Sequence, residues 1–370
     1  MPKGTSEVKS LSELMTPAGL KLLSASGTDL VREIGLDVVR GVVLDVLTGH
    51  NIRDSTEVLT RRRIVAINLA TVDLFLKGLA LSNSFISELP HLATTILGAG
   101  APSKAERWLA QWVLGLTDKG FQNVLRDNPD ALKRYRDRYI ETCRQTIEKH
   151  TERSGQLRGS LAIDSGVRAE INWLAMTYLL NTIGSQTLAI RGSDKSAYGK
   201  LFEKLILGSL LHILGFKFVT CPPDEFDGVF WLSSKDKRRE SDATLLYQAG
   251  KGVRFDIGFI GRGNPEISLD KVTRFEREIE IGGSAHYMAT IIIVDRIGPN
   301  SSIERLAREI GACIIQMSAG YWPREVAQEL NRVLGFEHKL LKMKQSRIGK
   351  FLERELSTVP LEDFIGPSSD

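Results

Sequence analysis

Two acidic residues in the second half of the chain have the spacing of a divalent-metal site. Asp256 lies in the apolar run 253–261, and Glu266 opens the next run, 266–272, after a turn that contains Gly and Pro. Side chains alternate between the two faces of a strand, so pairing across this turn can bring both carboxylates close together. Carboxylates at close range repel unless a cation lies between them, and Mg2+ is commonly held by one or two of them. The pair therefore predicts metal-assisted hydrolysis of a phosphate ester.

Two further charged residues are candidates for the same site. Lys271 ends the second run, and its long, flexible ammonium group can reach a neighbouring site and polarise the attacking water. Glu203 lies on a strongly apolar stretch, where a buried carboxylate is costly unless it serves a site. A position at the edge of a helix, exposed to solvent, is the alternative explanation for Glu203.

The elements that must position these residues follow from a change of pattern near residue 165. Residues 30 to 150 have apolar side chains at three- and four-residue spacing and predict helices without a catalytic cluster. A predicted helix at 168–180 leads through a loop with Gly184 and Gly192 to an apolar helix at 197–216. The later part predicts a three-stranded meander with strands at 240–248, 253–261 and 266–272. After it come a helix at 270–281, a strand at 289–296, a helix at 301–311, a strand at 312–317 and a helix after Pro323.

This order of elements resembles the αβββαβ core of PD-(D/E)XK nucleases over residues 197 to 318. The resemblance implies a mixed α/β fold with Mg2+ as cofactor, Asp256 as the Asp of the first motif and Glu266 as the acid of the second. Phe255 stands where Pro is expected, and Ser268 stands where Lys is expected, which makes Lys271 the candidate for the lysine role. Glu203 is similar to the extra acid on the first helix of many members, which implies that it holds a second metal ion or orients the lysine.

A second interpretation of the same core uses acids one strand earlier. Asp242, with Glu240 beside it, then becomes the Asp of the first motif, but position 258 should be Lys and is Gly. Asp270, on the same strand face as Glu266, is a further acidic alternative.

The segment after the predicted site resembles a recognition element of restriction enzymes that read CC:GG sequences. Arginine forks bind guanine in the major groove, and a carboxylate accepts a hydrogen bond from cytosine. The candidate recognition residues are Arg274, Glu276 and Arg277. The run from 240 to 271 is most similar to type II restriction endonucleases of the CfrBI kind, which cut CCWWGG. That resemblance implies double-stranded DNA as substrate, a homodimer for a palindromic site, and a partner DNA methyltransferase.

Composition and charge agree with a packed protein that binds an anion. The 370 residues are 42% hydrophobic and 25% charged, with a net charge of +4. We expect three segments: a helical N-terminal region at 1–160, the nuclease core at 161–335 and a basic C-terminal extension at 336–370. Basic clusters that could contact DNA phosphates, or form solvated surfaces, lie at 61–63, 133–138, 235–239 and 339–350.

Other classes find little support in the sequence. The N-terminus lacks the apolar stretch of a signal peptide, and no window approaches the 18 or so uninterrupted apolar residues of a membrane span, so we expect a cytoplasmic protein without a membrane partner. Cys143, Cys221 and Cys313 are too scattered for a zinc site or a disulfide framework and predict buried thiols. Nucleotide-binding loops and serine-hydrolase motifs are absent. A DNA-binding protein on a decayed nuclease core and a repair or junction-resolving nuclease remain alternatives.

Overall fold

The structure is a computed structural model that describes residues 10–25, 27–125, 130–164, 166–220, 227–233, 241–248, 250–259, 287–295 and 312–365. The chain forms two compact units that interleave in sequence. Met1–Ser26 and Thr60–Lys195 form one, here called the helical unit; Gly27–Leu59 and Ser196–Asp370 form the other, the sheet unit. The predicted division of the chain into segments at 1–160, 161–335 and 336–370 stays a prediction.

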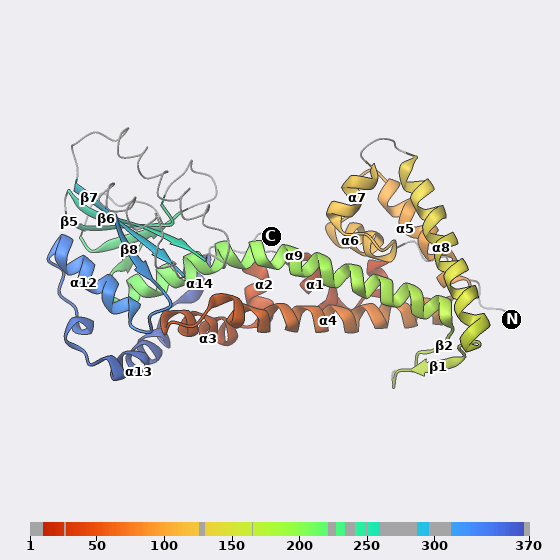
Figure 1. Cartoon of the computed structure of the whole chain (residues 1–370), viewed down its shortest axis with the longest axis horizontal. Coiled ribbons are helices and arrows are strands. Elements are labelled where there is room, and N and C mark those ends of the chain that lie inside the picture. Colours follow the sequence, from red (N-terminus) through yellow and green to blue (C-terminus); the bar gives the residue numbers. More distant parts are fainter. Residues whose placement is uncertain are drawn as a thin grey trace. The chain divides into compact units, whose positions relative to one another are not determined.

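The sheet unit contains a mixed sheet of six strands within the described part of the chain (Figure 1). In spatial order the strands are β3 (Lys217–Phe218), β4 (Val229–Leu232), β5 (Ala243–Gln248), β6 (Lys251–Gly258), β7 (Tyr287–Val294) and β8 (Ala312–Gln316). Strands β4, β5 and β6 form an antiparallel meander, and β6, β7 and β8 run parallel to one another. The expected mixed α/β fold is confirmed.

The sequence explains the central strands directly. Ile291, Ile292 and Ile293 of β7 are all completely buried, as expected for a strand with parallel neighbours on both sides and both faces covered. The β5–β6 hairpin turns at Gly250, whose φ of 75° is left-handed and favours glycine. At Gly252 a Cβ would lie only 2.8 Å from the carbonyl oxygen of Leu245, so this position accepts no side chain without movement.

The predicted meander is shifted by one strand. Strand β4, which the sequence analysis missed, is the first of the three, and β5 and β6 are the second and third. All eight residues of β6 pair with β7, and its other edge pairs with β5. The predicted pairing of 253–261 with 266–272 is therefore wrong for the residues of β6, because β5 and β7 occupy the two edges of this strand. Residues 266–272 themselves lie outside the described residues.

Helix α9 (Trp173–Ile213) is continuous through the predicted loop. Gly184, Gly192 and Ser193 are helical, and the predicted helix at 168–180 begins only at Trp173, after the short hairpin of β1 (Gly159–Ala162) and β2 (Arg168–Ile171). A glycine inside a helix costs only about 1 kcal/mol relative to alanine. Tertiary packing along both halves of α9 outweighs that cost, so glycine was a weak signal for a loop.

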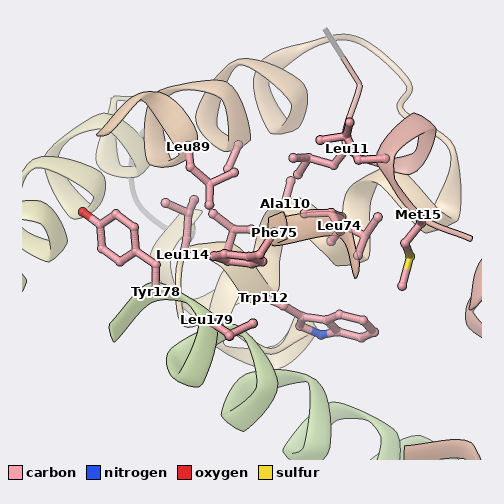
Figure 2. Packing of buried hydrophobic residues seen from close by; sticks show 14 of the residues in the cluster. Leu11, Met15, Leu74, Phe75, Leu89, Ala110, Trp112, Leu114, Tyr178 and Leu179 are labelled. Carbon is pink, nitrogen blue, oxygen red and sulfur yellow. The ribbon is translucent and has the colours of Figure 1, made fainter. Parts of the chain in front are cut away.

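The helical unit has its own apolar core. Its elements are η1 (Ser12–Leu14), α1 (Pro17–Ser24), most of α4 (Ile52–Leu81), α5 (Phe85–Gly98), α6 (Lys104–Val113), α7 (Asp118–Leu125), α8 (Ala131–Ser154) and the first part of α9. Figure 2 shows Leu179 of α9 pointing toward the cluster that contains Phe75, Leu114 and Trp112. The predicted helical character of residues 30–150 is confirmed wherever the structure describes them, turns and caps aside.

The basic cluster at 61–63 divides into two environments. Arg61 and Arg62 are exposed, whereas Arg63 is only 3% exposed and forms an ion pair with buried Asp194. Arg63 also donates from Nε and Nη2 to the carbonyl oxygen of Leu22, at 3.2 and 3.0 Å. Arg63 is therefore a structural residue and not part of a phosphate-binding surface.

The C-terminal segment packs into the sheet unit. After α12 (Trp322–Leu334) come η2 (Lys339–Lys342), α13 (Gln345–Leu356) and α14 (Leu361–Ile365), which join α2 (Gly27–Ile34) and α3 (Leu36–Leu47) in this unit. Figure 1 shows α12 lying beside the sheet, next to β8. The Trp322 indole donates to the Val46 carbonyl at 2.8 Å, and Arg40 donates to the carbonyls of Leu356 and Val359. Cations of 339–350 nevertheless remain exposed, among them Lys342, Lys344, Arg347 and Lys350.

One described helix, α4, is long and apolar enough to cross a membrane by length and composition alone. Core helices of soluble proteins pass the same test, and Ile67 and Leu74 of α4 are buried in the core of the helical unit. Among the predicted buried thiols, Cys143 is buried and Cys313 is half-buried, while Cys221 lies outside the described residues.

Candidate active site

Two carboxylates face each other on neighbouring strands of the meander. The register of β5 and β6 pairs Ala243 with Phe255, which places Asp242, one residue before β5, opposite Asp256 of β6. Opposed residues in an antiparallel pair have Cα atoms about 4.5–5.5 Å apart and side chains on the same face. The two strands therefore bring Asp242 and Asp256 together.

The backbone holds this acid pair in place. Oδ2 of Asp242 accepts a hydrogen bond from the backbone N–H of Ile257 at 2.9 Å, and the Asp242 carbonyl accepts from the N–H of Ser233 at 3.1 Å. Asp256 is only 1% exposed. A buried carboxylate beside a second one is strongly disfavoured in the charged form unless a cation offsets the repulsion. A cation between the two carboxylates would offset this repulsion.

The same face of the sheet carries further polar groups. Arg254 and Gly258 share a face with Asp256, because each is two residues away from it along β6. Arg254 lies between Thr244 of β5 and Thr290 of β7 in the register, and both threonines are buried. The opposite face of β6 is apolar: Val253, Phe255 and Ile257 are completely buried there. The polar groups of the sheet therefore gather on the face that carries the acid pair.

The acid pair lies near the carboxyl ends of the parallel strands. Asp256 is level with Ile292 of β7, and Asp295 and Gln316 lie at the ends of β7 and β8 at the same edge. Open sheets of parallel strands bind ligands at this edge, where backbone and loops leave a crevice. Asn51 also reaches it, donating from Nδ2 to Oδ2 of Asp295 at 3.1 Å.

Glu203 belongs to the part of α9 that lies in the sheet unit. It is half-buried, while its neighbours Phe202 and Leu205 are completely buried. This half-burial is compatible with the alternative explanation, a position at the edge of an apolar helix face, and the predicted part of Glu203 in the site stays a prediction.

Of the predicted site residues, the structure describes Asp256, Asp242 and Glu203. It brings Asp242, an alternative in the sequence analysis, next to Asp256. The remaining candidates lie outside the described residues: Glu240, Glu266, Asp270, Lys271, Arg274, Glu276 and Arg277. The signal that could have found the Asp242–Asp256 pair is the short apolar run Val229–Leu232, which supplies the first strand of the meander.

The donor set of the acid pair fits Mg2+. Among the described residues no cluster of three or more His, Cys, Asp and Glu side chains is suited to a metal, so these residues alone do not form an all-protein metal cage. Magnesium needs no such cage, because it usually keeps several waters and takes one or two carboxylates together with phosphate oxygens of the substrate. Asp242 and Asp256 would supply those carboxylates.

Two comparisons with known proteins point to the same family. The family model described as "CfrBI restriction endonuclease" matches residues 36–302, which include every predicted catalytic and recognition residue. The type II restriction enzyme CfrBI of Citrobacter freundii is 38% identical to this chain over 321 residues, which cover 86% of this chain and 88% of the relative. No solved structure matches the chain.

Proposed function

Because this chain belongs to the CfrBI restriction endonuclease family, we propose that it cleaves double-stranded DNA at a specific sequence with Mg2+ held by Asp242 and Asp256. The observation that carries the assignment of the site is the register of β5 and β6, which sets the two acids opposite each other on the polar face. When bound, the metal would neutralise charge that develops on the phosphate and lower the pKa of the attacking water.

Arg254 is the cation that we assign to the scissile phosphate. In the (D/E)XK motif a lysine follows the acid by two residues. If Asp256 is that acid, the lysine belongs at position 258, on the same face of the strand, and this chain has Gly258 there. Arg254 lies on that face too, two residues on the other side of Asp256. A guanidinium binds phosphate with two hydrogen bonds and stays protonated, so it would orient the phosphate rather than accept a proton.

The remaining candidates complete this proposal. Glu203 and Glu266 are assigned to coordinate or support the metal, with Asp270 and Glu240 as acidic alternatives. Lys271 is assigned to polarise the attacking water. These roles rest on the family resemblance and on the chemistry of each side chain.

The recognition element and the partners follow from the family. Arg274, Glu276 and Arg277 would read base edges in the major groove of a CC:GG-containing palindrome such as CCWWGG. A palindrome calls for a two-fold homodimer with one site per strand. A DNA methyltransferase would protect the host genome, and both enzymes would act in the cytoplasm.

The test is plasmid cleavage in Mg2+ by the wild type, Asp242→Asn, Asp256→Asn and Glu266→Gln. Asparagine keeps the shape and removes the charge, so both Asp variants should lose more than about 100-fold in rate while they stay folded. Chelation with EDTA should stop wild-type cleavage. Asp363→Asn, an exposed change on α14, serves as the matched control.

Each alternative has its own result in this assay. If Asp242→Asn cleaves at the wild-type rate and Glu266→Gln loses activity, Asp256 and Glu266 are the metal-binding pair, and the pair proposed here, Asp242 and Asp256, is overturned. Full activity of Asp256→Asn would exclude both pairs.

A further inference from the structure

A second candidate site lies in the helical unit. A cavity of about 760 Å³ opens between α6, α7 and the first part of α9. Its walls include Lys104, Arg107, Trp108 and Gln111 of α6, and Asp118 and Lys119 of α7. The volume is in the range of small-molecule sites, which combine an apolar wall with a few polar groups.

The cavity has a net positive wall. Arg107 is paired with Asp118, with Nη2 2.7 Å from Oδ1, so one positive and one negative charge offset each other. Lys104 and Lys119 also lie at the wall, so its ionisable side chains are three cations and one carboxylate. Partial burial, and then the nearby Arg63 guanidinium, lower the pKa of Lys104. An anion bound here would relieve that repulsion and favour the charged lysine.

An aromatic platform forms another part of the wall. Trp108 is half-buried and packs against completely buried Trp112, with ring centroids 5.6 Å apart. The Lys104 ammonium lies 5.0 Å from the Trp108 ring centroid. An indole that is backed by a second indole and exposed to a cavity can stack on a flat ring, and base stacking on aromatic side chains is a major term in nucleic-acid binding.

Gln111 supplies the hydrogen-bonding group. Its side chain is completely buried, and Nε2 donates to Oδ1 of Asp118 at 3.2 Å, which fixes the orientation of the amide. Its carbonyl oxygen, Oε1, accepts no hydrogen bond from the described residues. A buried acceptor without a donor is unfavourable, so a ligand that brings an N–H group to this wall gains the bond that the protein leaves unmade.

We propose that this cavity binds a nucleotide, with the base on Trp108, an exocyclic amino group on Gln111 and the phosphate beside Lys104 and Lys119. Stacking, a hydrogen-bond acceptor and a cationic rim are the three kinds of contact that a nucleotide requires. The same chemistry is offered by a free nucleotide and by an unstacked nucleotide of a DNA strand. That the DNA is the source rests on the proposed function.

The experiment uses tryptophan fluorescence of the full-length protein titrated with dCMP, dTMP and a short single-stranded oligonucleotide. Quenching should saturate, and Lys104→Ala and Trp108→Leu should weaken binding by about tenfold or more. Thymine lacks an exocyclic amino group, so dTMP should bind less tightly than dCMP, by about tenfold. Gln111→Leu should abolish that difference while leaving the stacking contribution. Lys149→Ala, on α8 outside the cavity, should behave as the wild type.

Each result decides a separate point. Saturation by the oligonucleotide, with or without binding of the mononucleotides, assigns the site to a DNA strand, and saturation by the mononucleotides without binding of the oligonucleotide assigns it to a free nucleotide. Equal binding by wild type, Lys104→Ala and Trp108→Leu overturns the proposal. Plasmid cleavage by the same variants keeps the two proposals apart: an active wild type with no cavity-dependent binding sinks only this one, and cavity-dependent binding without cleavage sinks only the catalytic one.

Discussion

Two positions on β6 can carry a cationic side chain beside Asp256. Residues 254 and 258 lie on the same face and flank Asp256 along β6. Glycine at 258 carries no functional group, whereas Arg254 does, and it lies between the buried hydroxyl residues Thr244 and Thr290. The local sequence thus places a guanidinium beside the candidate metal ligands.

We expect Arg254→Gln to lower the DNA cleavage rate by about 10- to 100-fold, because a preorganised positive contact to the phosphate is lost. Arg254→Lys should retain part of the rate, since the charge remains and only the two-point contact disappears. Single-turnover cleavage measures both. Arg53→Gln, an exposed change on α4, is the control; a wild-type rate in Arg254→Gln would contradict the assignment.

Neighbouring arginines provide a second contrast at the scale of single residues. Arg63 is buried with Asp194, while Arg62 is exposed. Arg63→Met should lower the free energy of unfolding by about 3–5 kcal/mol, because it leaves the Asp194 carboxylate buried without its cation. Arg62→Met should change it by less than about 0.5 kcal/mol. Urea denaturation measures both, and equal effects would mean that the ion pair adds nothing to stability.

At the scale of elements, α9 shows how packing overrides local propensity. Its glycines predicted a loop, yet the helix runs without interruption from Trp173 to Ile213. At Gly184 a Cβ would meet no atom of the described residues within 4 Å, whereas at Gly208 it would lie 2.6 Å from the Phe364 ring. One glycine is therefore replaceable, and the other makes room for α14.

These two glycines form a matched pair for testing the continuous helix. Gly184→Ala should raise the free energy of unfolding by about 0.5–1 kcal/mol, because alanine favours a helix. Gly208→Ala should lower it by about 1–3 kcal/mol through overpacking against Phe364. Thermal unfolding of the two variants measures the difference. Destabilisation by Gly184→Ala would indicate that the segment is not helical in solution.

The sheet illustrates the same rule for strands. The isoleucine run of β7 was predicted directly, because only a strand covered on both faces tolerates continuous apolar residues. Strand β4 was missed, since four residues after a Pro-rich stretch carry little pattern. Because β4 was missed, the predicted meander was displaced by one strand. The acid predicted to lie opposite Asp256 was therefore Glu266, whereas the register of β5 and β6 places Asp242 there.

At the scale of the whole sheet unit, His338 joins segments that are distant in sequence. Its ring lies against Phe336 and Phe351, with centroids 6.0 and 6.2 Å away, and Nδ1 accepts from the Leu340 N–H at 3.3 Å. Burial, and then the Lys339 cation, lower the pKa of His338 more than Glu355 and the Ile213 carbonyl raise it. The neutral imidazole is therefore the form that the folded unit prefers.

The sign of the pH effect follows from that lowered pKa. Below the ordinary histidine pKa of about 6.5 the unfolded chain binds a proton that the folded chain does not, so stability falls as the pH falls. When the pH is lowered from about 7.5 to about 5.5, the melting temperature should fall less in His338→Gln than in the wild type. Scanning calorimetry at both pH values measures this. Equal decreases would show that His338 does not contribute to the pH dependence of stability.

The sequence by itself determined the fold class, the family and the buried strands, and it singled out Asp256 as a candidate acid. These features depend on patterns within short segments: alternation along a strand, helical spacing and a cluster of acids near turns. The pairing of β5 with β6 was also predicted, but only the tertiary structure decided that β7 takes the other edge of β6, which leaves Asp242 as the described acid opposite Asp256. Strand pairing depends on which backbone edges remain open after the chain has folded, and no local pattern records which edge a later strand such as β7 will occupy.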